Sequence, residues 1–324
     1  MKHLIIMNQN AGSFSGEESL KSLVEKLFDG LDYEIYFTTG PKSSTKFLKE
    51  YLPNHTGDTV RVYACGGDGT INEVLNGIVG FDNVELAPYP IGTGNDFVKI
   101  YAKTDKYDEV CAGQLGAKRF LDFKKLIEAP TVNVDITELT ADTIQEPVYS
   151  INVINFGFDA IVGAMGNYYK DHGIPANASR KEKNDPYQYA LNHDAMKHGR
   201  FNNIEVFADG EKLNEKQLLL GTVANGQFVG GKFWASPKSS NTDGLLDVIV
   251  FKTMTFLGLG LIIGPYTKGK HLNRPNKKIV HRKVKEVKVI APAPIDMCVD
   301  GEMYKGSTFN LKIKPGAVKL VLPE

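Results

Sequence analysis

Two glycine-containing segments hold the residues best suited to carry chemistry. The first, CGGDGTINEVLNG at Cys65–Gly77, places three glycines around Asp68, and a helical pattern follows at once. Gly66, Gly67 and Gly69 would let the backbone approach a ligand closely, because glycine carries no Cβ. The free N–H groups and the dipole at a helix N-terminus attract anions, most often phosphate. The segment therefore predicts a phosphate site.

Asp68 is unusual in such a site, because a carboxylate repels a phosphate. A Mg²⁺ ion between the two would reverse that interaction, and a role as base toward a hydroxyl would also account for the residue. Thr70 would add a hydroxyl to the same site. The alternative is a tight turn in which Asp68 only caps the helix. The segment alone leaves these interpretations open.

The second segment, PIGTGNDF at Pro90–Phe97, favours the ligand-binding interpretation. It again follows a strand-like run, and it offers glycines, a threonine, Asn95 and Asp96. Two such loops on neighbouring strands of an α/β sheet can close around one nucleotide. Neither loop has the GxxxxGK[ST] pattern of a P-loop or the GxGxxG pattern of dinucleotide-binding proteins.

The elements around these loops predict an α/β unit followed by a β-rich unit. Strand-like runs at 3–8, 33–39, 59–66 and 85–92 alternate with helical patterns at 20–28, 45–52 and 71–78, which indicates a mostly parallel sheet. From Thr131 onward, β-like segments follow one another, apart from a polar, helix-tending insertion at 167–199. We expect domains at 1–129 and 130–314, with the last strand, 315–324, returning to the first.

Composition excludes several classes of protein. Hydrophobic residues make up 42% and charged residues 23%, and the formal net charge is zero, so no overall field attracts nucleic acid or a membrane. Three cysteines without CxxC spacing argue against a disulfide framework or a zinc site and favour the cytoplasm. The N-terminus lacks the pattern of a signal peptide. FLGLGLIIGPY at Phe256–Tyr266 is too short to span a membrane, and we interpret it as a core helix.

One local charge cluster stands out in this neutral chain. Lys268–Lys288 holds nine Lys or Arg residues and one acidic residue. Such a stretch is able to dock on anionic lipid headgroups, whereas the alternative is a solvated strand face. No RNA- or DNA-binding motif accompanies it, so nucleic acid is not an expected partner.

The two loops together identify a resemblance. GGDGTINEVLNG followed by PIGTGNDF resembles the diacylglycerol kinase-like lipid kinases, which include sphingosine kinases and compact bacterial lipid kinases. NAD kinases and phosphofructokinases share the GGDG core, but INEVLNG and the second loop favour the lipid kinases. NQNAG at 8–12, the stretch at 225–248 and DGE at 300–302 extend the resemblance over nearly the whole chain.

The resemblance implies a fold and a nucleotide site. The fold is an α/β nucleotide-binding domain with a mostly parallel sheet, of the NAD-kinase and diacylglycerol-kinase type, plus an all-β sandwich-like domain that binds lipid. ATP and substrate would meet in the cleft between the two. The residues expected around ATP are Asn8, Asn10, Thr39, Gly66, Gly67, Asp68, Gly69, Thr70, Asn72, Glu73, Gly92, Thr93 and Asn95.

It also implies an ATP- and Mg²⁺-dependent transfer of the γ-phosphate to a lipid hydroxyl, with diacylglycerol or a related lipid as acceptor. Asp300 or Glu302 would be the general base, while Asp68 would orient Mg²⁺ or the acceptor. From the residues alone, VDGE is better explained by a hairpin turn between strands, and the role as base comes from the resemblance. Two departures from the family pattern are Gln9, where proline is usual, and the long polar insertion at 167–199, which puts lipid contacts there in doubt.

A structural Mg²⁺ is the second metal that the resemblance implies. It would bind the side chain of Asp243 and main-chain oxygens near Ser240 and Leu245.

Two alternative functions remain. A soluble-substrate kinase of the NAD type would use the same GGDG core, and a catalytically silent nucleotide- or lipid-binding regulator would use the same domains. The presence of Asp68, Asp300 and Glu302 favours an enzyme over the regulator. We expect a lipid substrate and a cytoplasmic protein, peripheral at an anionic membrane surface, and leave dimerisation through the β-rich domain open.

Overall fold

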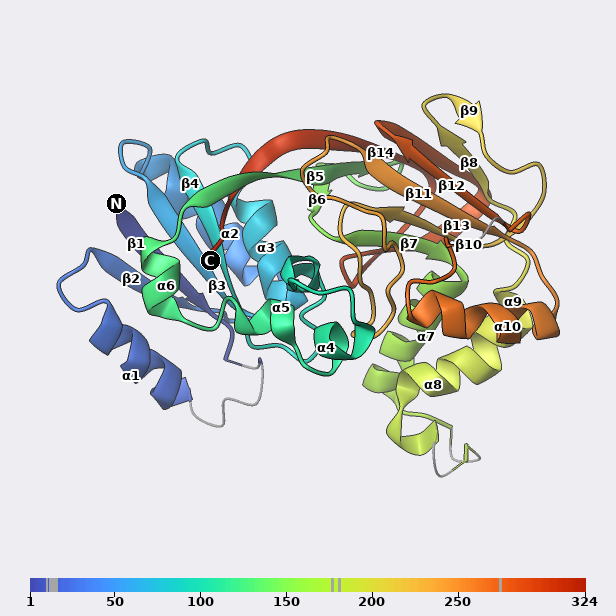
Figure 1. Cartoon of the computed structure of the whole chain (residues 1–324), viewed down its shortest axis with the longest axis horizontal. Coiled ribbons are helices and arrows are strands. Elements are labelled where there is room, and N and C mark those ends of the chain that lie inside the picture. The colour runs from blue at the N-terminus through green and yellow to red at the C-terminus, as the bar shows by residue number, and fades with distance from the viewer. Residues whose placement is uncertain (10, 12–16, 176–177, 180–181, 274–275) are drawn as a thin grey trace.

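The computed structural model describes residues 1–9, 11, 17–175, 178–179, 182–273 and 276–324. These residues form one 14-stranded sheet, with helices packed against both of its halves (Figure 1). The strands are β1 (Lys2–Met7), β2 (Tyr33–Phe37), β3 (Val60–Gly66), β4 (Val84–Pro90), β5 (Thr131–Ala141), β6 (Val148–Ser150), β7 (Val153–Gly157), β8 (Glu205–Ala208), β9 (Glu211–Lys212), β10 (Leu218–Ala224), β11 (Leu246–Lys252), β12 (Ile279–Val284), β13 (Glu286–Val299) and β14 (Glu302–Val321). The helices are α1 (Glu17–Leu27), α2 (Ser43–Tyr51), α3 (Asp68–Ile78), α4 (Tyr107–Cys111), α5 (Leu115–Lys118), α6 (Phe123–Glu128), α7 (Phe158–His172), α8 (Pro186–Ala190), α9 (Met196–His198) and α10 (Phe256–Thr267), with shorter turns η1 (Leu52–Asn54), η2 (Phe97–Tyr101), η3 (Glu182–Asn184) and η4 (Leu191–Ala195).

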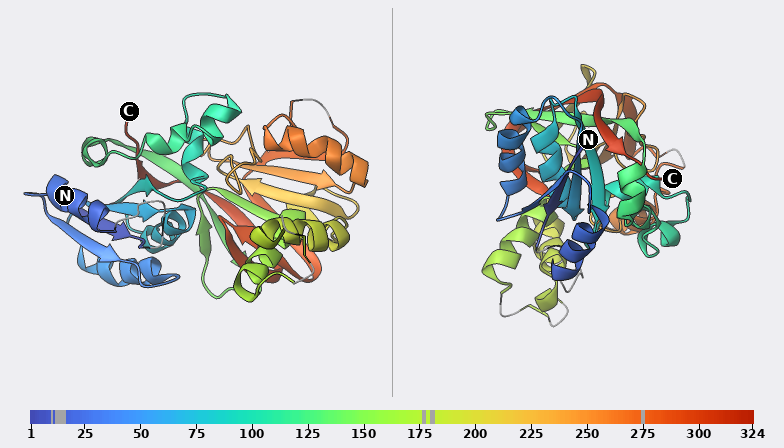
Figure 2. Two further views of the ribbon diagram at one scale, coloured as in Figure 1. Left: turned by 90° about the horizontal axis from the view of Figure 1, so that it is seen from below. Right: turned by 90° about the vertical axis from the view of Figure 1, so that its left-hand side faces the viewer.

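The N-terminal half is a parallel sheet in the order β4-β3-β1-β2. Every residue of β3 and β4 is buried, as expected for strands covered on both faces. α2 packs against α3, and α1 packs against α6, so that helices lie on both faces of this part of the sheet (Figure 2). The arrangement confirms the predicted α/β fold.

The C-terminal half is dominated by antiparallel strands, in the order β12-β11-β10-β7-β13-β14. Its apolar residues form two clusters. One lies among the strands and includes Phe156, Val248 and Phe309, and the other lies between the strands and the helices α7 and α10. This half confirms the predicted sandwich-like domain and adds a helical layer to it.

Two long strands connect the halves. β14 pairs with β13 along its first part and with β5 along most of its length, and Lys319–Leu320 then pair in parallel with Glu85–Leu86 of β4. Figure 1 shows β5 and β14 running side by side from one half to the other. We propose a domain division near Ala129–Pro130, and the pairing of β14 with β4 supports assigning 315–324 to the first domain.

Two sequence expectations need correction. The β-like segment at 149–159 is divided between β6, β7 and the start of α7, and Gly157, at φ +83°, turns the chain into the helix. The interpretation of Phe256–Tyr266 as a core helix is wrong for its outer face, because Leu257 is 75% and Leu261 71% exposed. Within the described ranges no helix is long and apolar enough to cross a membrane.

Candidate active site

The two glycine loops follow β3 and β4 and touch each other. A Cβ on Gly92 would lie 2.4 Å from the Cα of Gly67, and a Cβ on Gly66 would lie 2.1 Å from Oγ1 of Thr70. Because no real Cβ approaches other atoms so closely, only glycine fits these positions. The loops therefore present bare backbone at the C-terminal edge of the parallel strands, where α/β sheets bind ligands.

Asp68 is the first residue of α3, and it joins one loop to the other. Its Oδ1 accepts a hydrogen bond from the backbone N–H of Phe97 at 3.0 Å. Gly67 is the N-cap residue of α3, and the hydrogen bond of the Asp68 side chain goes to the second loop and not to its own helix. Burial, together with the nearby carboxylate of Asp96, raises the pKa of Asp68 to about 6. The carboxylate is therefore short of compensating positive charge.

Asp96 connects the second loop to the C-terminal half. Its Oδ1 accepts a hydrogen bond from Nζ of Lys99 at 2.6 Å, and its Oδ2 accepts one from the backbone N–H of Gly231 at 2.9 Å. The ammonium of Lys99 also donates to the carbonyl oxygen of Gly231 at 2.6 Å. Lys99 is only 2% exposed, so this buried ion pair fixes the loop against the other half.

Asp300 lies in the turn between β13 and β14. Asp300 and Gly301 have φ values of +49° and +100°, as in the tight hairpin turn that the sequence also allowed. The carboxylate accepts hydrogen bonds from Ser150 Oγ at 2.7 Å, from Asn72 Nδ2 at 3.0 Å, and from the backbone N–H groups of residues 151, 152 and 153 at 2.9, 3.2 and 2.9 Å.

These five donors occupy the acceptor positions of the Asp300 carboxylate. Burial raises the pKa of Asp300 above its ordinary value, against the hydrogen bonds, which favour the charged form. Glu302, two residues further on, is exposed, and none of the described residues donates to its carboxylate. Of the two predicted bases, only Glu302 has free acceptor oxygens.

A cavity of about 720 Å³ brings these carboxylates together. Its polar end is lined by Asp68, Asp96, Asp300 and Glu302, which come from both halves of the chain. Its remaining wall is built by α7, α10 and the strands beneath them, together with α8, η4 and the loop at 229–233. The apolar lining includes Phe158, Val162, Leu191, Leu219, Leu220, Val229, Phe233, Phe251, Leu259, Ile262 and Tyr266.

Two further carboxylate residues line the cavity, Asp185 and Asp159. Asp159 lies at the start of α7 and contacts Tyr266 of α10. Its Oδ2 accepts a hydrogen bond from the hydroxyl of Tyr266 at 3.1 Å. Burial raises the pKa of Asp159 to about 6, against that hydrogen bond. The pair thus places a polar group among the apolar side chains of the cavity wall.

The remaining residues predicted around ATP divide into two groups. Asn8 and Thr39 follow β1 and β2, at the same edge of the sheet as the glycine loops, and Nδ2 of Asn8 donates to Oγ1 of Thr70 at 2.9 Å. Thr93 is exposed, and Asn95, at φ +51°, donates to the carbonyl oxygen of Gly92 at 2.8 Å. Both groups of contacts hold the loop backbones in place.

Three residues of that set serve other purposes or cannot be placed. The Glu73 carboxylate accepts hydrogen bonds from the backbone N–H groups of Lys42 and Ser44 at 2.7 and 3.2 Å, at the N-terminus of α2. Asn72 is buried and binds Asp300. We therefore leave Glu73 out of the nucleotide site and treat Asn72 as a positioning residue. Asn10 lies outside the described residues.

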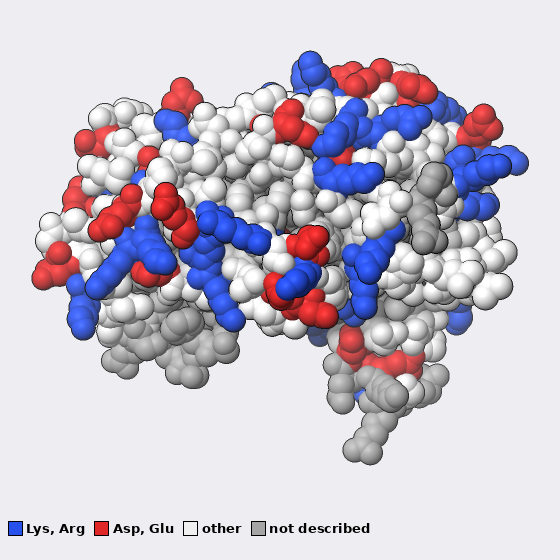
Figure 3. All heavy atoms as spheres, in the orientation of Figure 1, with Lys and Arg blue, Asp and Glu red and all other residues white. Residues whose placement is uncertain are grey.

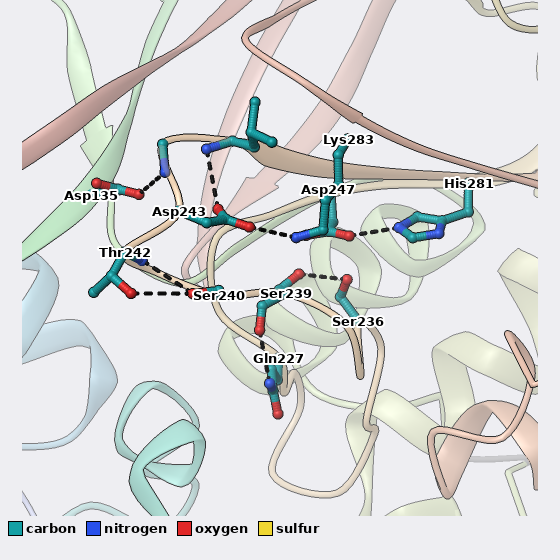
Figure 4. A network of polar contacts seen from close by, with 12 residues as sticks. Asp135, Gln227, Ser236, Ser239, Ser240, Thr242, Asp243, Asp247, His281 and Lys283 are labelled. Carbon is teal, nitrogen blue, oxygen red and sulfur yellow. Dashed lines mark hydrogen bonds and ion pairs between the residues drawn. The ribbon is translucent and has the colours of Figure 1, made fainter.

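The predicted structural magnesium site contains a lysine (Figure 4). Oδ2 of Asp243 accepts a hydrogen bond from Nζ of Lys283 at 2.6 Å, while its Oδ1 accepts one from the backbone N–H of Leu245 at 3.2 Å. The same ammonium lies 3.1 Å from Oδ2 of Asp247. Ser240 Oγ lies 3.2 Å from Oγ1 of Thr242. Lys283 already supplies positive charge to Asp243 here, so these side chains favour the ion pair over a bound Mg²⁺, and the structural metal stays a prediction.

The Asp68 end of the cavity does fit a Mg²⁺ that arrives with a nucleotide. Mg²⁺ is usually held by one or two carboxylates together with substrate phosphates. Asp68 and Asp96 both line the cavity beside the glycine loops, and the Asp96 carboxylate disfavours the charged form of Asp68. No cluster of three or more His, Cys, Asp or Glu side chains suited to a metal occurs in the part of the chain that the structure describes.

Comparison with known proteins places the chain in a family. Residues 2–139 match the diacylglycerol kinase catalytic domain, and residues 152–322 match the YegS C-terminal NAD kinase beta sandwich-like domain. A diacylglycerol kinase of Bacillus subtilis is 26% identical over 320 residues, which cover 95% of this chain and 92% of the relative. The crystal structure of a diacylglycerol kinase from Bacillus anthracis shares the fold, with a TM-score of 0.66, 20% identity, and coverage of 99% of this chain and 96% of that one.

The chain therefore belongs to the diacylglycerol kinase-like lipid kinase family, and it is a kinase.

Sequence reasoning missed two lysines that shape the site. Lys99 stands between apolar residues in FVKIY, and a charge inside a buried run is a signal for an ion pair. Lys283 carried no such signal, because it was one of many basic residues in its stretch. Asp159 was likewise hidden, since it lies at the end of a run that reads as a strand.

Proposed function

We propose that this kinase transfers the γ-phosphate of ATP, carried with Mg²⁺, to a hydroxyl of a lipid, with diacylglycerol or a related lipid as the acceptor. The observation that carries the proposal is the cavity that joins four carboxylates to an apolar chamber. An acceptor with apolar chains fits the chamber and brings its hydroxyl to the carboxylates. A polar acceptor such as NAD would leave the apolar wall of the chamber in contact with water, which is unfavourable.

The nucleotide phosphates would bind at the glycine loops, because the N-terminus of α3 offers free N–H groups and the glycines leave the backbone open. Asp68 would hold the Mg²⁺ that the phosphates carry, and that ion would neutralise phosphate charge. Phosphoryl transfer depends mainly on positioning and charge compensation. Two hydrogen bonds support such positioning, because each holds one of the loops. Asn8 binds Thr70 of the first loop, and Asn95 binds Gly92 within the second.

Glu302 is the general base in this proposal. Its carboxylate lines the cavity and has free oxygens to accept the proton of the acceptor hydroxyl. Asp300 instead holds the hairpin that carries Glu302, since its five hydrogen bonds attach the turn to α3 and to residues 150–153. The two residues are thus assigned different roles, which single substitutions distinguish.

The test measures labelled phosphate transfer from ATP·Mg²⁺ to dispersed lipids, including diacylglycerol, a sphingoid base and an isoprenoid alcohol, with NAD as a soluble acceptor. Glu302→Gln is expected to lower kcat by about 100-fold or more without changing Tm, as for loss of a general base. Asp300→Asn is expected to lower Tm as well. Glu211→Gln, an exposed glutamate in the β8–β9 hairpin, is the control and should leave both unchanged.

Other results would point elsewhere. Labelled NADP would assign the chain to the soluble-substrate kinases. ATP binding without transfer to any acceptor would favour the catalytically silent regulator. Near-normal turnover of Glu302→Gln would remove Glu302 as the base.

A further inference from the structure

The outer face of α10 is an exposed apolar surface. In this helix, which has no charged residue, Leu257 is 75%, Leu261 71%, Phe256 54% and Ile263 41% exposed. Leu257 and Leu261 lie one turn apart on the same side, with Gly260 beside them and nothing within 4 Å of a Cβ built on it. A contiguous apolar surface of this kind marks an interaction site, because water contact with it is unfavourable.

The inner face of the same helix lines the cavity. Leu259, Ile262 and Tyr266 all contribute to the chamber wall, and Ile263 reaches it as well. A single helix therefore separates the acceptor chamber from the exposed apolar surface. A partner on the outer face would lie one helix diameter from the bound acceptor.

Positive charge lies at the N-terminal end of this surface. The guanidinium of Arg200 stacks on the ring of Phe256, 3.6 Å from its centroid. Arg200 and Lys278 also line a hollow of about 710 Å³ beside the N-terminal end of α10. No acidic residue occurs between Asp247 and Glu286. Figure 3 shows the region of α10, at the right of the view, as uncharged surface with Lys and Arg at its borders.

We propose that this surface, defined by Phe256, Leu257 and Leu261 with Arg200 and Lys278 at its border, docks the kinase on an anionic lipid bilayer. An apolar helix face with a basic border matches the interior and the headgroups of such a bilayer. A second copy of the chain would instead bring like charges together. The inference rests on the proposed lipid acceptor, because docking would place the chamber next to the membrane that holds it.

The experiment compares two double variants of the full chain. Leu257→Gln/Leu261→Gln changes the docking surface, and Leu115→Gln/Leu121→Gln changes two leucines of the N-terminal half that are 40% and 39% exposed. Binding is measured by co-sedimentation with vesicles of phosphatidylcholine alone and of phosphatidylcholine with phosphatidylglycerol. We expect the wild type and the control to bind only the anionic vesicles, more weakly at high salt, and the α10 variant to bind about tenfold more weakly or worse.

Activity separates this inference from the proposed function. With a short-chain acceptor in free solution, the α10 variant should match the wild type, and with acceptor in anionic vesicles it should be about tenfold slower or worse. Loss of transfer to the soluble acceptor in the wild type would instead contradict the proposed function. Unchanged vesicle binding by the α10 variant would overturn the docking inference. A change from dimer to monomer with unchanged vesicle binding would also overturn it and assign the surface to a second copy.

Discussion

At the residue scale, Lys283 has the most specific consequence. Asp247 is fully buried, and its carboxylate accepts a hydrogen bond from Nε2 of His281 at 2.6 Å in addition to the ion pair with Lys283. Burial alone would raise the pKa of Asp247, but these two partners hold it below its ordinary value. The ammonium of Lys283 thus supplies, within the chain, the positive charge that a bound metal would supply at Asp243.

Lys283→Met should destabilise the protein by about 2 kcal/mol, because it leaves the buried Asp247 with one partner fewer. The free energy of unfolding by urea measures this, with Lys285→Met, at an exposed lysine two residues away, as the control.

Since the pKa of Asp247 is lowered, its stabilising effect is present above the ordinary aspartate value of 3.8 and is lost as the pH falls below it. The wild type should therefore lose stability there more steeply than Lys283→Met.

The Tm of the wild type should be the same in EDTA and in Mg²⁺. A Tm that falls in EDTA and recovers only with Mg²⁺ would show a structural metal after all.

The sequence predicted the carboxylates of the cavity and of the Asp243 segment better than it predicted the side chains that bind them. Asp68 stands in a glycine loop whose pattern is visible in the chain, whereas the place of Asp300 at the cavity was implied by the family resemblance and not by its local pattern. The Lys283 ion pair depends on the register of β11 against β12, in which Asp247 lies directly opposite Lys283. Many registers of these two strands satisfy the hydrophobic pattern about equally well, so this pairing could not be read from the residues.

At the element scale, the contact between the two glycine loops determines the shape of the nucleotide site. Gly92→Ala should force the loops apart, since its Cβ would lie 2.4 Å from the Cα of Gly67. We expect the affinity for ATP to fall by about tenfold or more, because the N–H groups would no longer converge on one phosphate. Isothermal titration with ATP·Mg²⁺ measures this. Gly57→Ala, where a Cβ has nothing within 4 Å, should bind as the wild type does. Equal affinities for both variants would remove the loops from the nucleotide site.

Element types were predictable where one periodicity dominated. The parallel strands are continuous apolar runs, and β3 and β4 each begin and end within two residues of their expected bounds. α10 shows the limit of such reasoning. A helix that is apolar on every side is usually buried, so its composition indicated a core position. Which side meets the chamber and which meets solvent depends on α7 and β11, which lie far away in the sequence.

At the scale of the whole molecule, β5 and β14 make the two halves parts of one sheet. We expect a single unfolding transition in urea, because β14 pairs with strands of both halves, so that unfolding of one half removes strand pairing from the other. Trp234, the only tryptophan, lies in the C-terminal half and reports there by fluorescence, while circular dichroism reports on the helices and strands of both halves. The two midpoints should coincide. Separate midpoints would show that the halves unfold independently.

The overall class was predictable because βα alternation gives way to successive strands near Pro130. The continuity of the sheet was not, because the length of β14 depends on partners from both halves. TFNLKIKPG predicts only the middle of a strand that extends over 20 residues.

The buried ion pair between Asp96 and Lys99 has a consequence for how the two substrates influence each other. Asp96 belongs to the loop assigned to the nucleotide, and Gly231, which it contacts, is next to the chamber residues Val229 and Gly230. We expect a shift of this loop on nucleotide binding to move the chamber wall, and a shift of that wall to move the loop. Linkage makes this coupling reciprocal: the factor by which ATP changes acceptor affinity equals the factor by which acceptor changes ATP affinity.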